Sequence, residues 1–331
     1  MANKKILQSE NYQNIWITKI DNSLIIDFKR LEGGVSSDVF KVKTKKKLYC
    51  IKRSLPKLRV KKEWLADTKR IKFEYLWLKH CKKIIPNSIP NVYKFSSKNH
   101  YLILEYLNEN KYKNLKEEFL RKKIDYKIII KISKDLFKIH KNSTSKNIKK
   151  KFSDNSKNFY DLRLDAYFNE VARVHPKLNV KIKKITNNYK INSSTLIHGD
   201  FSPKNMLVYN KTIKYIDAET CNYGDPAFDL VYFANHLLIK SIHIPQKKHH
   251  FINSYKIFFD TYLGSLELSK RNIFFERCVE MIPIMLLARV DGKSPVEYIT
   301  KENKKNKIRL LAFKLIENSP KSLNALIKII K

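Results

Sequence analysis

The first third of the chain alternates apolar and polar positions in short runs, a pattern that predicts β-strands. The clearest runs are SLIIDF, DVFKVKTKKKLYCIKR, in which a lysine-rich turn separates two alternating halves, and HYLILEY. One helix is expected among them, at about Glu63 to Cys81, where apolar residues recur on a broad face before the two prolines of PNSIPNV. The pattern therefore predicts a strand-rich segment with one helix, from about Leu24 to Leu107.

Beyond Asn108 the apolar spacing becomes that of amphipathic helices. Such helices are expected at 126–140, 162–174 and 252–263. Residues 195–217 are the exception, because LIHGDFSPKNMLVYN and TIKYID indicate two short strands and polar loops. We expect an α+β protein with a small antiparallel sheet and one helix in residues 1–107, and a larger, mostly helical lobe in residues 108–331.

The charge of the chain is unusual, since 68 Lys and Arg against 31 Asp and Glu give a formal net charge of +37. A nucleic-acid binder normally concentrates its charge in one patch and uses many arginines. Here only 11 of the basic residues are arginine, and the lysines run through nearly every polar segment. We interpret the charge as a bias of the whole composition, and expect nucleic acid to bind only non-specifically through it. The 43% of hydrophobic residues is sufficient for a folded core.

The spacing of the cysteines and the length of the apolar stretches indicate the cellular location to expect for the protein. Cys50, Cys81, Cys221 and Cys278 lie far apart and without the paired spacing of a zinc site or a disulfide framework. The N-terminal MANKKILQSE has no apolar signal core, and the most apolar later stretch, residues 281–290, is shorter than the ~20 residues that span a bilayer. We expect a cytoplasmic protein with no membrane partner.

The polar loops within residues 195–217 contain the groups that phosphoryl transfer requires. That reaction uses a carboxylate to orient the attacking hydroxyl, and an amide and a second carboxylate to hold Mg²⁺. Asp200 and Asn205 lie five residues apart in HGDFSPKN, and Asp217 follows twelve residues later at the end of TIKYID. Each residue alone would be an ordinary turn residue, and only the triplet indicates chemistry. We expect Asp200 to be catalytic, and Asn205 and Asp217 to be metal ligands.

This loop has the catalytic-loop spacing of eukaryotic-like kinases, with HGD in place of HRD and IDAE in place of DFG. Followed by YGDPAFDL, it resembles the aminoglycoside phosphotransferase and choline kinase family of small-molecule kinases. The segments CIKRSLPKLRVKKEW and RIKFEYLWL resemble the smaller lobe of methylthioribose kinases, although Pro203 and Asn205 depart from the catalytic loop of that branch. The resemblance implies a two-lobed protein-kinase-like fold, ATP and Mg²⁺ as cofactors, a small-molecule acceptor, and a catalytic loop braced by Asp229. His198 is expected to hold this loop by hydrogen bonding.

A lysine and a glutamate are predicted to bind the non-transferred phosphates of ATP. Lys52 closes the strand LYCIK, where alternation directs its side chain away from that of Ile51 and into the cleft between the lobes. Glu74 lies on the following helix and is the expected ion-pair partner.

Two further segments are candidates for nucleotide binding. The turn with Gly33, Gly34 and Ser36 precedes the strand pair, although it lacks the complete GxGxxG pattern and would also suit a plain hairpin. Glu105 and Leu107 lie in the segment that joins the lobes, where backbone groups would bind adenine.

Residues outside the motifs must select the acceptor. Arg163 and Tyr167 are one helical turn apart, and a packing role remains equally open for them. Arg289 follows the apolar run MIPIMLLA, and an arginine in that position is typically paired with a buried carboxylate or a phosphate. Glu219 remains open as a further carboxylate near the metal.

The sequence as a whole predicts an ATP-dependent phosphotransferase that phosphorylates a hydroxyl of a small metabolite, such as a sugar or an amino alcohol. The alternative is a basic binding protein that uses a kinase-like scaffold for RNA or an acidic partner. Intact Lys52, Asp200, Asn205 and Asp217 argue against a scaffold, and the absence of an APE-like segment between Asp217 and Asp229 argues against a protein kinase.

Overall fold

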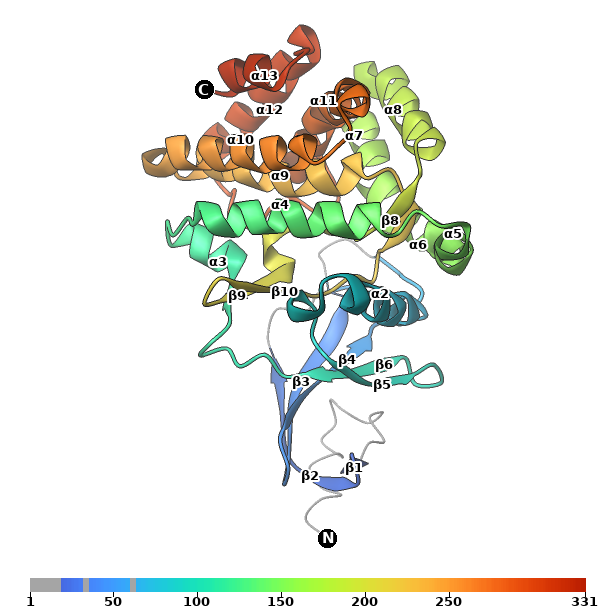
Figure 1. Ribbon diagram of the computed structural model, residues 1–331. Helices are drawn as coiled ribbons and strands as arrows, with labels where there is room; N and C mark the ends of the chain where they lie inside the picture. The colour runs from blue at the N-terminus through green and yellow to red at the C-terminus, as the bar shows by residue number, and fades with distance from the viewer. Residues whose placement is uncertain (1–18, 32–35, 60–63) are drawn as a thin grey trace.

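The computed structural model describes residues 19–31, 36–59 and 64–331. In these residues a β-sheet near the N-terminus lies below a larger group of helices (Figure 1). Gly33 and Gly34 of the predicted phosphate turn lie outside the described residues, as does Glu63, the predicted start of the first helix.

The N-terminal sheet has six antiparallel strands in the order β1-β2-β3-β4-β6-β5. Their bounds are β1 Lys19–Ile20, β2 Ser23–Leu31, β3 Ser37–Thr44, β4 Leu48–Ser54, β5 Val92–Ser96 and β6 Tyr101–Glu105. The alternation of β3 and β4 buries one face in a small core formed by Ile20, Ile25, Phe40, Val42, Tyr49, Ile51, Tyr101 and Ile103. Because neighbouring side chains on a strand point to opposite faces, Lys52 is directed away from this core.

The helix of the N-terminal part, α2, comprises Arg70–Ile84 and begins later than the sequence predicts. The apolar residues Trp64 and Leu65 extend the helical pattern, but the described part of that segment is not helical and Leu65 forms an isolated β-bridge with Lys57. The helix continues three residues beyond the predicted end and stops just before Pro86, which cannot continue it.

The C-terminal part is mostly helical. Its α-helices are α3 Leu115–Leu120, α4 Tyr126–Lys141, α5 Lys146–Phe152, α6 Ser156–Phe159, α7 Glu170–Val174, α8 Asn179–Ile191, α9 Ala227–His243, α10 Lys248–Gly264, α11 Leu268–Asp291, α12 Glu302–Asn318 and α13 Leu323–Ile330. Single 3₁₀ turns occur at Pro86–Ser88, Ser153–Asn155, Pro176–Leu178, Pro203–Asn205 and Pro245–Lys247. A π-helical segment, Tyr160–Asn169, connects α6 to α7, so the helix predicted at 162–174 is π-helical in its first part and α-helical only over α7. Helix α9 is buried along nearly its whole length, so it forms the centre of this part of the fold.

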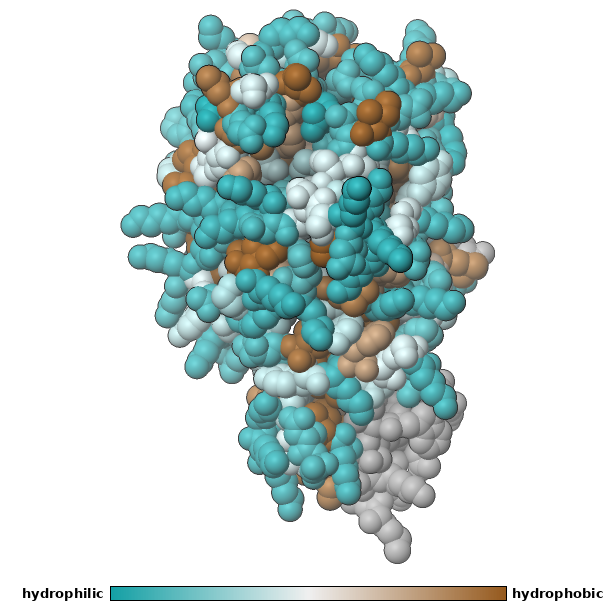
Figure 2. All heavy atoms as spheres, turned by 45° about the vertical axis from the view of Figure 1, so that its right-hand side comes forward, coloured by the Kyte–Doolittle hydropathy of each residue, from teal (hydrophilic) through white to brown (hydrophobic). Residues whose placement is uncertain are grey.

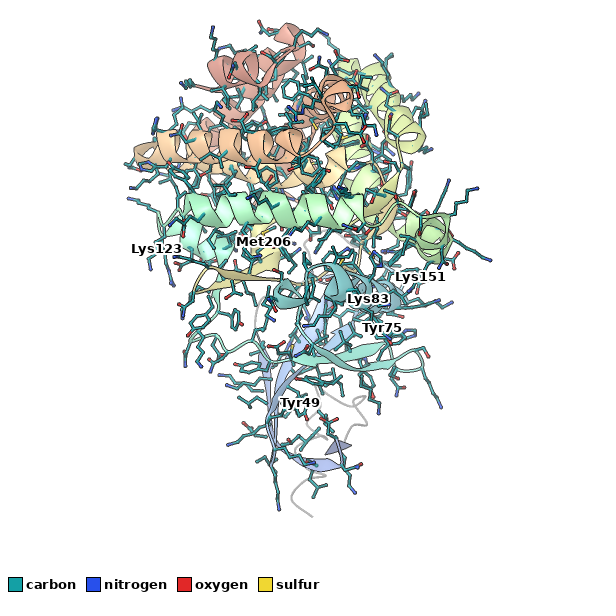
Figure 3. All side chains as sticks on the ribbon, viewed as in Figure 1. Tyr49, Tyr75, Lys83, Lys123, Lys151 and Met206 are labelled. Atoms are coloured by element: carbon teal, nitrogen blue, oxygen red, sulfur yellow. The ribbon has the colours of Figure 1, made fainter. Side chains whose placement is uncertain are left out.

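Five short strands in the C-terminal part position its polar loops. They are β7 Lys113–Asn114, β8 Thr195–Ile197, β9 Met206–Tyr209, β10 Thr212–Tyr215 and β11 Asn222–Gly224. The sheets β10-β9-β7 and β11-β8 place residues 198–205 between β8 and β9, and residues 216–221 between β10 and β11. Met206, where β9 begins, lies between the N-terminal sheet and the long helices (Figure 3). The predicted α+β architecture is confirmed, and its division after Leu107 stays a prediction.

The surface agrees with a charge that is spread over the molecule. Hydrophilic residues cover most of the face drawn in Figure 2, with only small hydrophobic areas between them. Lys83, Lys123 and Lys151 are exposed and extend from separate parts of the chain (Figure 3). Among the residues that the structure describes, no helix combines the length and the apolar character that crossing a membrane requires.

Candidate active site

The loop after β8 depends on a glycine and on a buried aspartate. Gly199 has φ +75°, and a Cβ there would lie 2.3 Å from the carbonyl oxygen of Thr220, so only glycine fits. The carboxylate of Asp229, in the first turn of α9, accepts hydrogen bonds from the backbone N–H groups of His198 (2.6 Å) and Gly199 (2.9 Å). A carboxylate at the start of a helix also interacts favourably with the helix dipole. The brace predicted for Asp229 is therefore present.

His198 connects the same loop to the next one. Its Nδ1 accepts a hydrogen bond from the backbone N–H of Asp200 (3.2 Å), and its Nε2 donates to the carbonyl of Ile216 (3.2 Å). Burial lowers the pKa of His198, which favours the neutral ring with one donor and one acceptor nitrogen that these contacts require. Trp77 of α2 packs edge-on against this ring, at 4.9 Å between centroids. His198 thus holds the loop, as predicted.

Asp200 is buried and has two chemically different oxygens. Its Oδ2 lies 3.1 Å from the guanidinium of Arg163 and 3.1 Å from the ammonium of Lys204. Its buried Oδ1 has no hydrogen-bond partner among the described residues. Burial opposes ionisation of this carboxyl, but the charges of Lys204 and Arg163 outweigh it and hold the pKa of Asp200 below its ordinary value. The site therefore presents an ionised carboxylate with one oxygen free to accept a hydrogen bond.

Asn205 and Asp217 are brought together by backbone contacts. The Asn205 side chain donates to the carbonyl of Asp200 (2.9 Å), and the Asn205 carbonyl accepts from the N–H of Ile216 (3.1 Å), next to Asp217. Asp217 has φ 65°, a left-handed conformation that aspartate tolerates better than most residues. Its N–H donates to a carboxylate oxygen of Glu74 (3.2 Å).

A buried group of charges connects the N-terminal sheet to this loop. The ammonium of Lys52 lies 2.7 Å from Glu74 Oε2, which is the predicted ion pair, and it also contacts the carboxylate of Asp217. Arg70, the first residue of α2, binds Glu219 through its Nε (3.0 Å). Carboxylate oxygens of Glu74, Asp217 and Glu219 all lie within 4.8 Å of one another.

This group carries more acid than base, because three carboxylates face Lys52 and Arg70. Burial raises the pKa of Glu74 although Lys52 is adjacent to it. A hard divalent cation such as Mg²⁺ prefers oxygen ligands and would neutralise the excess negative charge. The donor set around Asp217 therefore fits a bound Mg²⁺.

The two substrate candidates on the π-helical segment lie beside Asp200. Arg163 donates from its Nε to the carbonyl of Gly199 (2.6 Å) and pairs with Asp200. Its guanidinium carbon lies 5.7 Å from the centre of the Tyr167 ring, and the Tyr167 hydroxyl hydrogen-bonds the Tyr232 hydroxyl (2.8 Å).

Arg289, in the last turn of α11, also lies close to the Tyr167 ring. It donates to the Tyr167 hydroxyl (2.7 Å) and to the carbonyl of Ser294 (2.6 Å), and its guanidinium carbon is 5.4 Å from the Tyr167 ring centre. In the part of the chain that the structure describes, no carboxylate pairs with Arg289, and its Nε is buried without a partner. Of the two partners that the sequence analysis expects for Arg289, a buried carboxylate or a phosphate, the carboxylate is thus not found among the described residues.

The remaining nucleotide candidates are less directly connected to the site. The carbonyl of Ser36 accepts hydrogen bonds from the Arg70 guanidinium and from the N–H of Leu55. The N–H of Glu105 already donates to the carbonyl of Asn91 (2.8 Å), and Leu107 follows two residues after the end of β6.

Two cations of the site, Lys204 and Arg70, were not predicted from the sequence. Lys204 lies inside HGDFSPKN, four residues after Asp200, and this short spacing within one loop could have indicated their ion pair. Arg70 had no such signal, because its partner Glu219 is 149 residues away.

Comparison with known proteins gives one family. Residues 27–242 match the sequence model of the phosphotransferase enzyme family. A comparison with curated proteins finds no match. Among solved structures, the chain is similar to a spectinomycin phosphotransferase in complex with ADP and spectinomycin, at 17% identity and a TM-score of 0.53 over 93% of each chain.

Two further solved structures have a similar fold. An ethanolamine kinase from Plasmodium vivax is 16% identical with a TM-score of 0.56, over 89% of this chain and 84% of that chain. A choline kinase from Cryptosporidium parvum is 14% identical with a TM-score of 0.53, over 92% and 93%. At these identities the similarity concerns the fold, which is the two-lobed, kinase-like one that the motifs predict.

Replacing Asp229 with Ala should destabilise the protein by about 3 kcal/mol, because the buried N–H groups of His198 and Gly199 lose their acceptor. Urea unfolding of both proteins measures the difference. Asp260→Ala is the control, since Asp260 is half exposed and its pair with Lys256 should contribute less than about 1 kcal/mol. A loss below about 1 kcal/mol in Asp229→Ala would show that the brace is not required.

Proposed function

The chain belongs to the phosphotransferase enzyme family, and from that premise we propose that it is an ATP-dependent kinase that phosphorylates a hydroxyl of a small metabolite, such as a sugar or an amino alcohol. The observation that supports this most directly is Asp200, a buried carboxylate with one oxygen bound to Arg163 and Lys204 and the other without a partner among the described residues. The solved spectinomycin phosphotransferase contains ADP and spectinomycin, which also supports a nucleotide and a small-molecule acceptor here.

In this proposal the acceptor hydroxyl donates a hydrogen bond to Asp200 Oδ1. Its oxygen forms a bond to the γ-phosphorus of ATP while the bond from that phosphorus to the β,γ-bridging oxygen breaks, so that ADP leaves and the hydroxyl proton passes to Asp200. Because its pKa is lowered, Asp200 is a weak base that orients the hydroxyl first and takes the proton late. A loose phosphoryl-transfer transition state requires no stronger base.

The other side chains position the phosphates. Lys52, oriented by Glu74, binds the α- and β-phosphates, and Asn205 and Asp217 hold Mg²⁺. When bound, Mg²⁺ supplies positive charge to the phosphate oxygens. Glu219 is the further oxygen ligand nearest to Asp217, provided that it separates from Arg70.

Two further sequence predictions concern the proposed nucleotide site. The turn with Gly33, Gly34 and Ser36 is expected to bind ATP, and the segment of Glu105 and Leu107 is expected to bind adenine through its backbone. Non-specific attraction of nucleic acid and a cytoplasmic location stay predictions as well.

Asp200→Asn should lower turnover by about 10² to 10⁴, the range of a lost general base, while ATP binding changes little. Turnover is measured as ADP release with a panel of sugars, methylthioribose, choline, ethanolamine and aminoglycosides, and as slow hydrolysis of ATP without an acceptor. Asp161→Asn is the matched control, because it removes the same charge from the π-helical segment that contacts Asp200 through Arg163, while Asp161 itself pairs with Lys157 at the surface. More than a tenth of wild-type turnover in Asp200→Asn would contradict the assignment.

Asp217→Ala should abolish the increase in ATP affinity that Mg²⁺ produces, and Asn205→Ala should reduce it less, because a neutral amide attracts the cation less than a carboxylate. Calorimetry of ATP binding with Mg²⁺ and with EDTA measures both. With EDTA, Asp217→Ala should bind ATP at least as tightly as the wild type, since a negative charge facing the phosphates has been removed. An unchanged effect of Mg²⁺ in Asp217→Ala would exclude the metal role.

A further inference from the structure

Helix α9, whose first turn is hydrogen-bonded to the catalytic loop, has a row of polar residues on one side. Tyr232, His236 and Lys240 of α9 are spaced four residues apart, so they share one face. The first contacts Tyr167, and the last donates to the hydroxyl of Tyr298 (3.1 Å). The row therefore extends from the surroundings of Asp200 toward the segment that follows α11.

The buried charges near this row are all positive beyond Asp200. Arg289 and Lys240 are both buried, and no carboxylate pairs with either of them within the described ranges. Buried cations are normally paired, because removal from water is costly. Asp291, two residues after Arg289, pairs with Arg309 (2.7 Å) and His175 (2.8 Å), and Glu297 is largely exposed and pairs with Lys116 (2.6 Å). An anion bound here would supply the missing partner.

Two buried nitrogens at this place also lack hydrogen bonds. They are Nε of Arg289 and Nδ1 of His236, and neither has a partner among the residues described. The charges of Lys240, Arg289, Asp200 and Lys204 all act on the pKa of His236, so these four side chains lie in its neighbourhood. Unpaired buried polar atoms are rare in folded proteins, and a bound ligand would provide the partner that these two lack.

From these contacts we propose that the acceptor carries an anionic group, a carboxylate or a phosphate, and that Arg289 binds this group with His236 and Lys240 while Asp200 receives its hydroxyl. The inference rests on the proposed function and narrows it. Hydroxy acids, acidic sugars, hydroxylated amino acids and sugar phosphates fit, whereas choline and ethanolamine do not, because their cationic ends would face Arg289 and Lys240. Arg163 is satisfied by Gly199 and Asp200, so it completes the catalytic end of the pocket.

Lys240 gives the site a pH dependence. Burial, together with the charges of Lys116 and Arg289, lowers the pKa of Lys240 to about 7, against the opposing influence of Glu297 and Glu117. The protonated form attracts an anion, so this contribution is present below pH 7 and is lost as the pH rises above it. We expect KM for an anionic acceptor to rise between about pH 6.5 and 8.5, and Lys240→Met to remove most of that rise.

The first experiment compares acceptors. ADP release is measured with glycerate, homoserine and gluconate, with glycerol phosphate and ribose 5-phosphate, with glycerol and ribose, and with choline and ethanolamine. The proposal expects turnover with the carboxylates (glycerate, homoserine and gluconate) or with the phosphates (glycerol phosphate and ribose 5-phosphate). The group that is turned over shows which anion the site binds. Activity confined to the neutral or cationic compounds overturns it.

The second experiment uses Arg289→Met, which should raise KM for the active acceptor about 10- to 100-fold with a smaller change in kcat, the effect of losing a charge-assisted contact. Arg173→Met removes the same charge from an exposed position on α7 and should leave KM unchanged. Arg289→Lys should restore part of the affinity. An unchanged KM in Arg289→Met overturns the proposal, and Lys240→Met provides the same comparison if Arg289→Met does not fold.

A third measurement does not depend on turnover. Calorimetry of acetate and inorganic phosphate binding to the protein saturated with ADP and Mg²⁺ should detect a site in the wild type that Arg289→Met weakens at least 10-fold. Equal binding in both proteins overturns the anion site. Failure of the proposed kinase function is recognised separately, by the absence of Mg²⁺-dependent ATP binding.

Discussion

The buried ammonium of Lys52 constrains the arrangement of three distant segments. A charge removed from water must be compensated, and the two carboxylates that do so come from α2 and from the loop after β10. The sheet, the helix and the loop must therefore be positioned together, because a shift of one would leave a buried charge unpaired. Arg70 and Glu219 add a second buried pair between the same helix and the same loop. The site is thus built at the junction of the two parts of the fold.

The charges change sign across this junction. On the side of Asp217, three carboxylates exceed their cationic partners, which suits a metal and the phosphates it accompanies. On the side of Arg289, buried cations lack carboxylate partners within the described residues. Asp200 lies between the two sides, paired with Arg163 and Lys204. This distribution of charge agrees with the proposed reaction, in which the metal-bound phosphoryl donor lies on the side of Asp217 and an anionic acceptor lies on the side of Arg289.

The sequence predicted features that local patterns or fixed spacings encode. The alternation of β3 and β4 gave the correct face for Lys52, and the HGD motif with its downstream aspartates identified the loops that meet in the fold. The predicted start of α2 was wrong because Trp64 and Leu65 extend the apolar pattern, whereas backbone hydrogen bonds with residues 56–58 hold residues 64–66 in an extended conformation. The π-helical geometry of 160–169 and the pairing of Arg70 with Glu219 depend on contacts between segments far apart in sequence, which no local pattern contains. The roles of the individual site residues and the division after Leu107 stay predictions.

Helix α9 fixes the distance between side chains that lie along it, as well as the position of the catalytic loop. Its N-terminal Asp229 is bonded to the catalytic loop, while Lys240 lies eleven residues further along the same buried helix. A helix rises about 1.5 Å per residue, so Tyr232 and Lys240 are about 12 Å apart along its axis. In the proposed acceptor site, the side chains of Tyr232 and Lys240 are therefore held at a fixed separation by one helix. Such a site would select its acceptor by length, because a compound in which the hydroxyl and the charged end are too close together or too far apart would reach only one of its two contacts.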